Sequence, residues 1–540
     1  MSKLDTGDFF MFKRVSLAFF TLCVVFGLLI VNIGIIIADI GSSPATKSQS
    51  TKTYLLSSSR GMIYDRNMQR IVNRESEDFA VCLPTTSALK FINTYAPEDE
   101  KNALYETLQN GNIGIFKTPV TFNKNDIKSV AITNRYGENQ PLVHLIGHLD
   151  ENGVGVMGLE KAYNSLLSRQ SGQLNAVWSV DAIGNILLGE GIKIESKKYL
   201  SSSGIQLTID LKIQEIAENS LKNNNINKGA VVILDSNTNE ILAMASIPTF
   251  NPLDLGAGIN DSDQPFINRA ITPYSVGSVF KPFVASVAIE NNIDLTYNCT
   301  GTIKIGNTSF SCSNHTAHGE VDMKTATEKS CNTYFIALGQ KVGAEKLRSL
   351  SSDFGLGKEI ELADNFYLNI GNLPTAESIN SPQSLANLSF GQGELLASPL
   401  QMAVAYSTFA NEGFYRPPTL MKAIIDENGD TIQKVTLPEK YRILNNSTAE
   451  KIDSYLESVV ANGNGNKAFS TLVSNRGKTA TAQSGWYKDG REINHTWFCG
   501  YFTAKEKTYV VAIFKEDGIS GANDCAPVFK EISENVMQLE

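Results

Sequence analysis

A serine and a lysine three residues apart form the first group that could carry out chemistry. Ser278 and Lys281 stand in the stretch YSVGSVFKPFVASVAIENN. Side chains at this spacing meet on one face of a helix. Pro282 indicates that the helix has just begun, because proline is tolerated where few backbone N–H groups are committed. A lysine buried there can lose its proton and activate the serine hydroxyl as a nucleophile.

This pair is a weak signal alone, because Ser87 and Lys90 have the same spacing. Acyl transfer also needs a hydroxyl that returns the proton to the leaving amine and an amide that holds the substrate peptide. Ser330 and Asn332, in EKSCNTYF, offer both groups. The same serine–asparagine spacing occurs elsewhere in the chain, so the order of the motifs has to decide.

A cationic segment near the C-terminus supplies the third element. Residues 478–481, in RGKTATAQSGW, follow a glycine and precede a hairpin, where a sheet edge would lie. A cationic strand can bind a substrate carboxylate, and its backbone N–H can stabilise an oxyanion. The same four letters, KTAT, stand at 324–327, shortly before Ser330. We interpret this first copy as a solvated face of a helix.

Two cysteines and two histidines are concentrated between the first two motifs: Cys299, Cys312, His315 and His318. Such a set is a tetrahedral zinc pattern, whereas thiols in an oxidising compartment form a disulfide by default. We expect a structural zinc ion held by Cys299, Cys312 and His318, with His315 or Asp294 as the fourth ligand. A Cys299–Cys312 disulfide and free thiols are the open alternatives. Cys331, inside the second motif, is expected to be a buried small side chain.

The order of the three motifs resembles the triple motif of penicillin-interacting serine transferases. Further blocks, among them RGMIYDRN, HLIGHLDENGVGVMGLEKAYN, GAVVILDSNTNEILAMASIPTFNP and LSFGQGELLASPLQMAVAYSTFANEG, are similar to those of class B penicillin-binding proteins. The similarity runs from about residue 55 to the end. It implies a membrane-anchored, monofunctional peptidoglycan D,D-transpeptidase of the division or sporulation type, without C-terminal PASTA repeats.

The resemblance implies acyl transfer in two steps. Ser278 attacks the penultimate D-Ala carbonyl of a stem peptide and the terminal D-Ala leaves. An amine from a neighbouring stem then resolves the acyl-enzyme and forms the cross-link. Lys281 would act as the base, Ser330 would relay the proton and Asn332 would orient the acyl amide. The chemistry implied requires no cofactor.

The third motif would bind the substrate in this scheme. Lys478 would keep the field positive, while Thr479 and Thr481 would receive the carboxylate. The backbone N–H groups of Ser278 and Thr481 would form the oxyanion hole. Ala480 stands where the family usually has glycine. We expect its methyl group to narrow the cleft, although its backbone N–H remains available.

Two rival functions use the same motifs. A β-lactamase or D,D-carboxypeptidase would pass the acyl group to water, and a non-enzymatic β-lactam-binding scaffold would carry Ala480 as a sign of decay. The expected partners are the lipid-linked peptidoglycan precursor with its stem peptides, β-lactams, the membrane and a SEDS-type glycosyltransferase. A role in elongation, septation or the spore cortex stays open, as does the oligomeric state.

One segment of the chain has the length and composition of a membrane anchor. Residues 15–38 contain no charged side chain, and Lys13 and Arg14 precede them. As a helix, this segment would reach roughly 36 Å, enough to cross a bilayer core of about 30 Å. The positive-inside rule places the N-terminus in the cytoplasm and the catalytic part outside. A cleaved signal peptide is the alternative.

The remaining chain favours a mixed α/β architecture. The 540 residues carry a net charge of −9, which gives no basic footprint for nucleic acid. Apolar runs predict hairpins at 229–246 and 495–517, and a helix closes the chain at 526–538. The resemblance implies an antiparallel five-stranded sheet between helices. The expected parts are a cytoplasmic tail at 1–14, the anchor at 15–38, a mixed pedestal or dimerisation domain at 39–200 and the transpeptidase domain at 201–540.

Overall fold

The structure is a computed structural model that describes residues 6–42, 51–363 and 365–539. Two compact units are present. The first comprises Met1–Ser59, Ser76–Thr133 and Gly172–Tyr199, and the second comprises Arg60–Glu75, Asn134–Ser171 and Leu200–Glu540. Two segments from before residue 200 thus pack with the C-terminal part of the chain. The division into domains at residue 200 stays a prediction.

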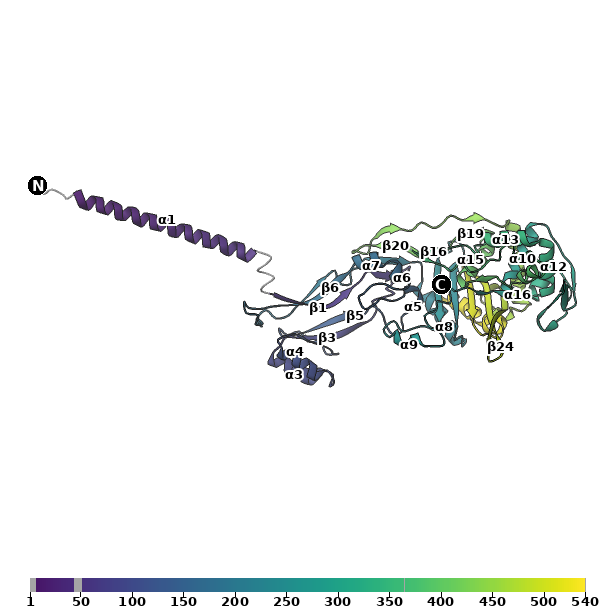
Figure 1. Ribbon diagram of the computed structural model, residues 1–540, viewed down its shortest axis with the longest axis horizontal. Helices are drawn as coiled ribbons and strands as arrows, with labels where there is room; N and C mark the ends of the chain where they lie inside the picture. The colour runs from purple at the N-terminus through teal and green to yellow at the C-terminus, as the bar shows by residue number, and fades with distance from the viewer. Residues whose placement is uncertain (1–5, 43–50, 364, 540) are drawn as a thin grey trace. The chain divides into compact units, whose positions relative to one another are not determined.

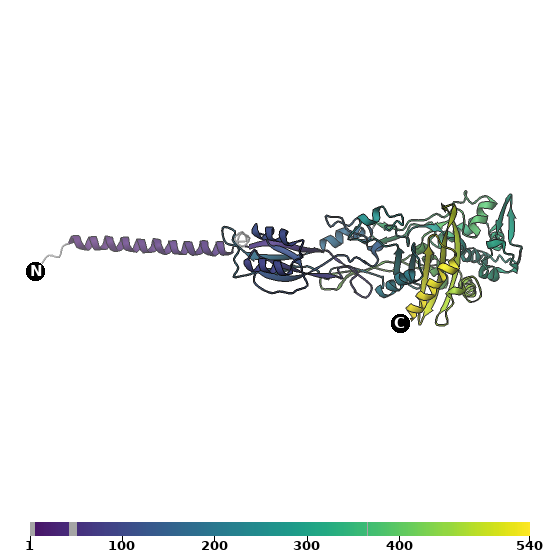
Figure 2. The same cartoon turned by 90° about the horizontal axis from the view of Figure 1, so that it is seen from below.

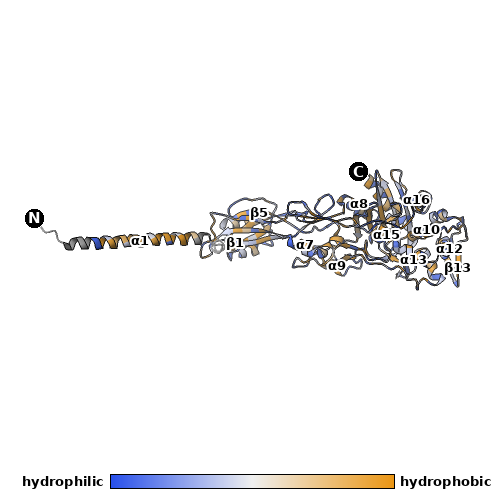
Figure 3. Cartoon of the chain, turned by 90° about the horizontal axis from the view of Figure 1, so that it is seen from above, coloured by the Kyte–Doolittle hydropathy of each residue, from blue (hydrophilic) through white to orange (hydrophobic). Residues whose placement is uncertain are grey.

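The first unit begins with the long helix α1 (Thr6–Ser42). Within it, Lys13–Ala38 has a mean hydropathy of 2.8 and is long and apolar enough to cross a membrane. Figure 3 shows the hydrophobic colouring along this helix. Its side chains from 13 to 38 are exposed over the whole circumference, which is the pattern of a helix that would face lipid.

Two small antiparallel sheets make up the rest of the first unit, with strand orders β1-β6-β7 and β4-β3-β5. Two helices pack on the second sheet through Ala88, Phe91 and Ile92 of α3 and Leu104 and Leu108 of α4. The bounds are β1 (Thr51–Ser59), β3 (Ser76–Cys82), α3 (Thr86–Tyr95), α4 (Lys101–Gln109), β4 (Gly114–Lys117), β5 (Ile127–Thr133), β6 (Gly172–Ser179) and β7 (Lys193–Lys197).

A five-stranded antiparallel sheet forms the centre of the second unit, with the order β10-β9-β25-β24-β23. Its strands are β9 (Gly229–Asp235), β10 (Ile241–Ile247), β23 (Ser474–Lys488), β24 (Arg491–Ala504) and β25 (Lys507–Lys515). The two predicted hairpins, β9–β10 and β24–β25, are confirmed. Strand β9 reads as a continuous apolar run because helices cover both faces of the sheet.

Helices pack against both faces of this sheet. On one face, α8 (Leu211–Asn223) and the closing helix α18 (Ala526–Leu539) share a core with Val231 and Ile233 of β9. On the other face, α15 (Pro399–Ala410) packs on β9, β24 and β25. Figure 2 shows α18 (yellow) beside the yellow strands of the sheet. The expected sheet between helices is therefore present.

A second sheet of four strands, β2-β8-β20-β21, joins the segment 60–75 to the C-terminal part of this unit. Buried Glu160 stabilises the early segments, because it accepts hydrogen bonds from Arg60 at 2.8 Å and from Arg135 at 2.8 Å. The bounds are β2 (Met62–Tyr64), α5 (Val143–Ile146), α6 (Gly158–Ala162), α7 (Asn164–Arg169), β8 (Gly204–Leu207), β20 (Met421–Ile425) and β21 (Thr431–Lys434).

Shorter elements build the rest of the second unit, most of them in the segment between β10 and β23 (Figure 1). They are α9 (Gly256–Ile259), β11 (Tyr274–Ser275), η1 (Gly277–Phe280), α10 (Lys281–Glu290), β12 (Tyr297–Cys299), β13 (Thr302–Ile305), β14 (Thr308–Ser311), η2 (Ser313–His315), β15 (Gly319–Val321), α11 (Met323–Glu328), α12 (Asn332–Val342), α13 (Ala344–Asp353), β16 (Glu361–Ala363), β17 (Phe366–Tyr367), α14 (Pro382–Ser389), β18 (Leu396–Ala397), β19 (Phe414–Tyr415), β22 (Tyr441–Arg442), α16 (Asn446–Ala461), η3 (Asn466–Ala468) and α17 (Gly521–Asp524).

Candidate active site

Ser278 lies in the 3₁₀ turn η1, which leads directly into helix α10. Pro282 falls in the first turn of α10, so the predicted helix start is confirmed. The turn approaches strand β23 closely through Gly277, whose φ is +61°. A Cβ atom added there would lie 2.9 Å from the Cβ of Ala482. Only glycine combines this backbone conformation with this approach, and the result places Ser278 beside β23.

Lys281 connects the first two motifs. Its side chain is fully buried, and Nζ donates hydrogen bonds to the carbonyl oxygen of Ser330 at 2.7 Å, to Ser330 Oγ at 3.1 Å and to Asn332 Oδ1 at 2.7 Å. Burial lowers the pKa of Lys281 to about 7, because a charged amine loses its hydration in the interior. A large fraction of this amine is therefore neutral near physiological pH.

The third motif runs along β23, which is an edge strand of the sheet. Lys478 is fully buried and donates from Nζ to the carbonyl oxygen of Thr479 at 3.0 Å. Its pKa lies well below the usual value, first because of burial and second because of the charge of Lys281. The charge of Lys281 thus disfavours the charged form of Lys478.

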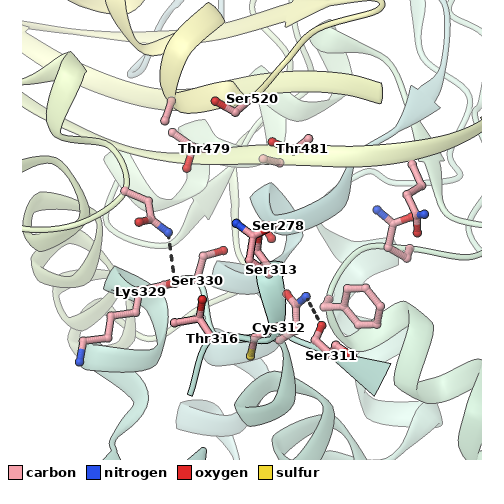
Figure 4. Close-up of a pocket in the computed structure, with 18 of the residues that line it drawn as sticks. Ser278, Ser311, Cys312, Ser313, Thr316, Lys329, Ser330, Thr479, Thr481 and Ser520 are labelled. Atoms are coloured by element: carbon pink, nitrogen blue, oxygen red, sulfur yellow. Dashed lines mark hydrogen bonds between the residues drawn. The ribbon is translucent and has the colours of Figure 1, made fainter. Parts of the chain in front are cut away.

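A cavity of about 810 Å³ brings residues of all three motifs together. Figure 4 shows Thr479 and Thr481 on the strand above Ser278, with Ser330 to one side. The predicted site residues that line the cavity are Ser278, Ser330, Asn332, Thr479, Ala480 and Thr481, together with Cys312 and His318 of the cysteine–histidine set. The hydroxyl groups of Ser278 and Ser330 thus line one cavity, while Lys281 and Lys478 are fully buried and do not line it.

The methyl group of Ala480 lies beside the serine-bearing turn. Ala480 is only 3% exposed, and its Cβ would lie 3.4 Å from a Cβ added to Gly277. On its other side, the backbone of Ala480 meets Gly521, where an added Cβ would come within 2.4 Å of the Ala480 carbonyl oxygen. Ala480 therefore contacts the surroundings of the serine-bearing turn and also lines the cavity, and the expectation that its methyl group narrows the cleft stays a prediction.

The first KTAT copy and the pair Ser87 and Lys90 do not line the cavity. The first KTAT copy forms α11, as predicted, but not as a solvated face, because Ala326 and Thr327 are buried against the core. The sequence did not reveal this burial because a helix of six residues is too short for a clear period. Ser87 and Lys90 lie in α3 of the first unit.

Three of the expected zinc ligands lie close together, and the fourth residue of the group is not one of those expected. Cys299, Cys312, His318 and Cys331 each offer a donor atom, and these atoms lie within 4.8 Å of one another. Cys331 is buried, as expected, but it is also the fourth donor of the group, a place we had assigned to His315 or Asp294. The turn between α11 and α12 carries its thiol to within 3.7 Å of Cys312 Sγ.

The distances within this set match those of a tetrahedral metal centre. Cys299 Sγ lies 3.8 Å from Cys312 Sγ and 3.3 Å from His318 Nδ1. Ligand atoms about 2.3 Å from a central zinc ion would be separated by about 3.8 Å at the corners of a tetrahedron. The cysteines of the described chain are free thiols.

A match to a protein family covers most of this unit. Residues 229–534, more than half of the chain, match the family described as the penicillin binding protein transpeptidase domain. The chain belongs to this family. The resemblance seen in the three motifs is thus confirmed at the level of the family.

Named relatives of the family align beyond this domain. The penicillin-binding protein PbpB of Mycolicibacterium smegmatis is 30% identical over 424 residues, which cover 73% of this chain and 63% of that protein. The chain therefore spans less than two thirds of the length of PbpB. The peptidoglycan D,D-transpeptidase MrdA of Haemophilus influenzae is 25% identical, with 96% of this chain and 91% of that protein aligned.

Solved structures of the family share the fold. The D,D-transpeptidase domain of a peptidoglycan glycosyltransferase from Eggerthella lenta is 26% identical and has a TM-score of 0.63, covering 89% of this chain and 98% of that one. A chain of a peptidoglycan synthase complex that coordinates polymerization and crosslinking has a TM-score of 0.70 at 22% identity, covering 97% and 99%. Mixed α/β architecture around a penicillin-binding transpeptidase domain is thus established.

Several residues that line the cavity lie outside the three motifs and were not predicted from the sequence. They are Ser311, Ser313, Asn314, Thr316, Lys329, Phe390, Gln392, Asn464, Gln483, Asn494, Ser520 and Ala522. Phe390 and Gln392 belong to the LSFGQGE block that carried the resemblance, so a signal existed for them. Asn464 and Ser520 stand in polar loops whose composition is ordinary, and only the fold brings them to the cavity.

Proposed function

We propose that the chain is a membrane-anchored serine D,D-transpeptidase that cross-links peptidoglycan stem peptides and is acylated by β-lactams. The observation that carries the proposal is the buried amine of Lys281, which is hydrogen-bonded to Ser330 and Asn332 beside a cavity that Ser278 lines. Family membership and the name of the relative MrdA support the same reaction.

In this proposal Ser278 is the nucleophile and neutral Lys281 removes its proton. Ser330 passes a proton to the leaving amine, and Asn332 holds the acyl amide. Thr479 and Thr481 receive the terminal carboxylate of the stem, and Lys478 acts through the electric field of the site from its buried position. The backbone N–H groups of Ser278 and Thr481 stabilise the oxyanion, which typically contributes about 3 kcal/mol per donor.

The localisation follows from the same reasoning. Helix α1 anchors the chain in the membrane, and Lys13 and Arg14 hold its N-terminal end in the cytoplasm, so that the transpeptidase unit is extracytoplasmic. A SEDS-type glycosyltransferase is the proposed partner, because cross-linking requires a growing glycan. The likeness to a chain of a peptidoglycan synthase complex supports this pairing.

A structural zinc ion is proposed at the cysteine–histidine set, with Cys299, Cys312, His318 and Cys331 as ligands. Three thiolates and one imidazole form a donor set that suits zinc, and their spacing fits its tetrahedral geometry. The ion would brace the loop between Cys312 and His318, which lines one wall of the cavity.

Reconstitution with lipid-linked precursor and a polymerising glycosyltransferase tests the proposed reaction. The full-length chain should produce cross-linked stem peptides, and Ser278→Ala should produce none. Release of D-Ala without cross-links would indicate a carboxypeptidase instead. Absence of both products from wild-type protein that still binds penicillin would indicate a scaffold.

A further inference from the structure

Ser330 occupies a backbone conformation that usually belongs to glycine. Its φ is +55°, and it ends helix α11 in a Schellman turn. In this turn Cys331 N donates to the carbonyl oxygen of Ala326 at 2.9 Å, and Ser330 N donates to that of Thr327 at 3.2 Å. A residue with a side chain is strained in this region by roughly 1–3 kcal/mol and persists only where its surroundings hold it.

The turn leaves two helix-end carbonyl groups without a helical partner, and one residue satisfies both of them. Asn464, in the loop after α16, donates from its backbone N to the carbonyl oxygen of Glu328 at 3.3 Å and from Nδ2 to that of Lys329 at 3.1 Å. The last four carbonyl groups of a helix need such partners. Asn464 therefore completes the hydrogen bonding of the turn that presents Ser330.

The loop after α16 approaches the Ser330 turn so closely that position 463 has no room for a side chain. A Cβ atom on Gly463 would lie 2.5 Å from the carbonyl oxygen of Glu328. Ser458 of α16 adds a bond to the Glu328 side chain at 2.7 Å. Three points of contact thus join α16 and its following loop to the end of α11, directly before Ser330.

We propose that Asn464 is a positioning residue for the proton relay. It fixes the strained Ser330 turn so that Ser330 Oγ stays near Lys281 Nζ, at 3.1 Å, and faces the cavity. This inference rests on the proposed function. In acylation Ser278 Oγ first adds to the carbonyl carbon and forms the oxyanion, and the carbon–nitrogen bond then breaks as the carbonyl group re-forms. The leaving nitrogen takes the Ser330 proton, and Ser330 regains the proton that Lys281 removed from Ser278.

The relay has a consequence that depends on the leaving group. An amine, or the nitrogen of a β-lactam, leaves only when it is protonated, whereas a thiolate leaves without a proton. Misplacement of Ser330 should therefore slow acylation by a penicillin far more than acylation by a thioester of comparable acyl group. Loss of folding or of substrate binding would slow both reactions alike.

Two substitutions at position 464 and one nearby control test the proposal in the full-length protein. Asn464→Ala removes the side-chain donor. Asn464→Asp keeps the shape but presents an acceptor to the Lys329 carbonyl group. We expect both to reduce the second-order rate constant of penicillin acylation tenfold or more, with thioester acylation reduced less than threefold. Asn466→Ala, in the turn η3 that directly follows this loop, should change both rates less than twofold.

The outcomes separate this inference from the proposed function. Rates within twofold of wild type for both position 464 variants would overturn it, as would an equal fall of the penicillin and thioester rates in Asn464→Asp protein with an unchanged melting temperature. A loss in Asn466→Ala as large as in Asn464→Ala would also overturn it. Failure of penicillin to acylate the wild-type chain would contradict the proposed function instead.

Discussion

At the scale of single residues, Lys281 is the side chain on which the proposed chemistry depends. Complete burial disfavours its charge, while its three hydrogen-bond acceptors orient the amine between the second-motif residues Ser330 and Asn332. The pKa of about 7 that results is suited to a general base at neutral pH, because such a base must be neutral yet still bind a proton well.

The pH dependence of acylation tests this role. Lys281 gains base activity as it loses its proton, so the rate constant for penicillin acylation should rise about tenfold per pH unit below pH 7. It should level off above the pKa of Lys281, about 7. Lys281→Arg should remove this dependence and reduce the rate by roughly 10²–10⁴-fold, since arginine stays protonated. A rate that is flat from pH 5 to 8 in the wild-type protein would contradict the assignment.

Ala480 gives a second prediction at this scale. Because its methyl group packs toward Gly277, Ala480→Gly should loosen the contact between β23 and the Ser278 turn. We expect acylation to slow by a similar factor for small penicillins and bulky cephalosporins, measured as second-order rate constants. Ala326→Gly, in the first KTAT copy, is a control that also removes a buried methyl group but lies outside the cavity. It should lower stability by roughly 1 kcal/mol or more and change acylation less than Ala480→Gly. Faster acylation by bulky cephalosporins alone would instead support a methyl group that narrows the cleft.

At the scale of elements, the cysteine–histidine set links short segments that few backbone hydrogen bonds hold together. Cys299 ends the short strand β12, Cys312 follows β14 and Cys331 precedes α12. The strand pairs β12–β15 and β13–β14 are each only two strands wide, which is marginal for stability without a further staple. The loop that lines the cavity from Ser313 to Thr316 lies between these elements.

Metal analysis of the purified protein tests the proposed staple. We expect about one zinc ion per chain, and removal by a chelator should lower the melting temperature, because a metal bound only by the folded state stabilises it. Cys331→Ser and His318→Ala should lose the ion, whereas His315→Ala should retain it. If Cys331→Ser retained the zinc ion and His315→Ala lost it, the fourth ligand would be His315, as expected from the sequence, and not Cys331.

At the scale of the whole molecule, the chain combines a membrane-spanning candidate with two folded units that alternate along the sequence. The hairpins of the central sheet were predictable because their strands are long apolar runs on either side of a turn. The meeting of residues from all three motifs at one cavity was predictable because the motifs keep a characteristic order. Both signals can be found in short stretches of the sequence or in the order of motifs along it.

Other features depend on contacts that linear patterns do not encode. Glu160 meets Arg60 across 100 positions, and Asn464 reaches the Lys329 carbonyl group across 135. Cys331 was assigned to packing because it lies inside a catalytic motif, although the left-handed turn at Ser330 directs its thiol to the other cysteines. In each case the side chain is ordinary in the sequence and acquires its role from a turn or a tertiary contact.

The orientation of the chain in the membrane gives a prediction at this scale. Lys13 and Arg14 should keep the N-terminus in the cytoplasm. A C-terminal fusion to alkaline phosphatase, which is active only outside the cytoplasm, should therefore be active, and one to green fluorescent protein exported by the same route should be dark. A bright fluorescent fusion with inactive phosphatase would contradict the proposed orientation.

The central claim is that Ser278 forms the acyl-enzyme, and mapping of a covalent penicillin adduct tests it most directly. After incubation of the full-length protein with a labelled penicillin, mass spectrometry of its peptides should find one adduct, on the peptide that contains Ser278. Ser278→Ala should show no adduct, and Ser87→Ala should be labelled like the wild type. An adduct on the Ser87 peptide, or labelling that persists in Ser278→Ala, would contradict the account.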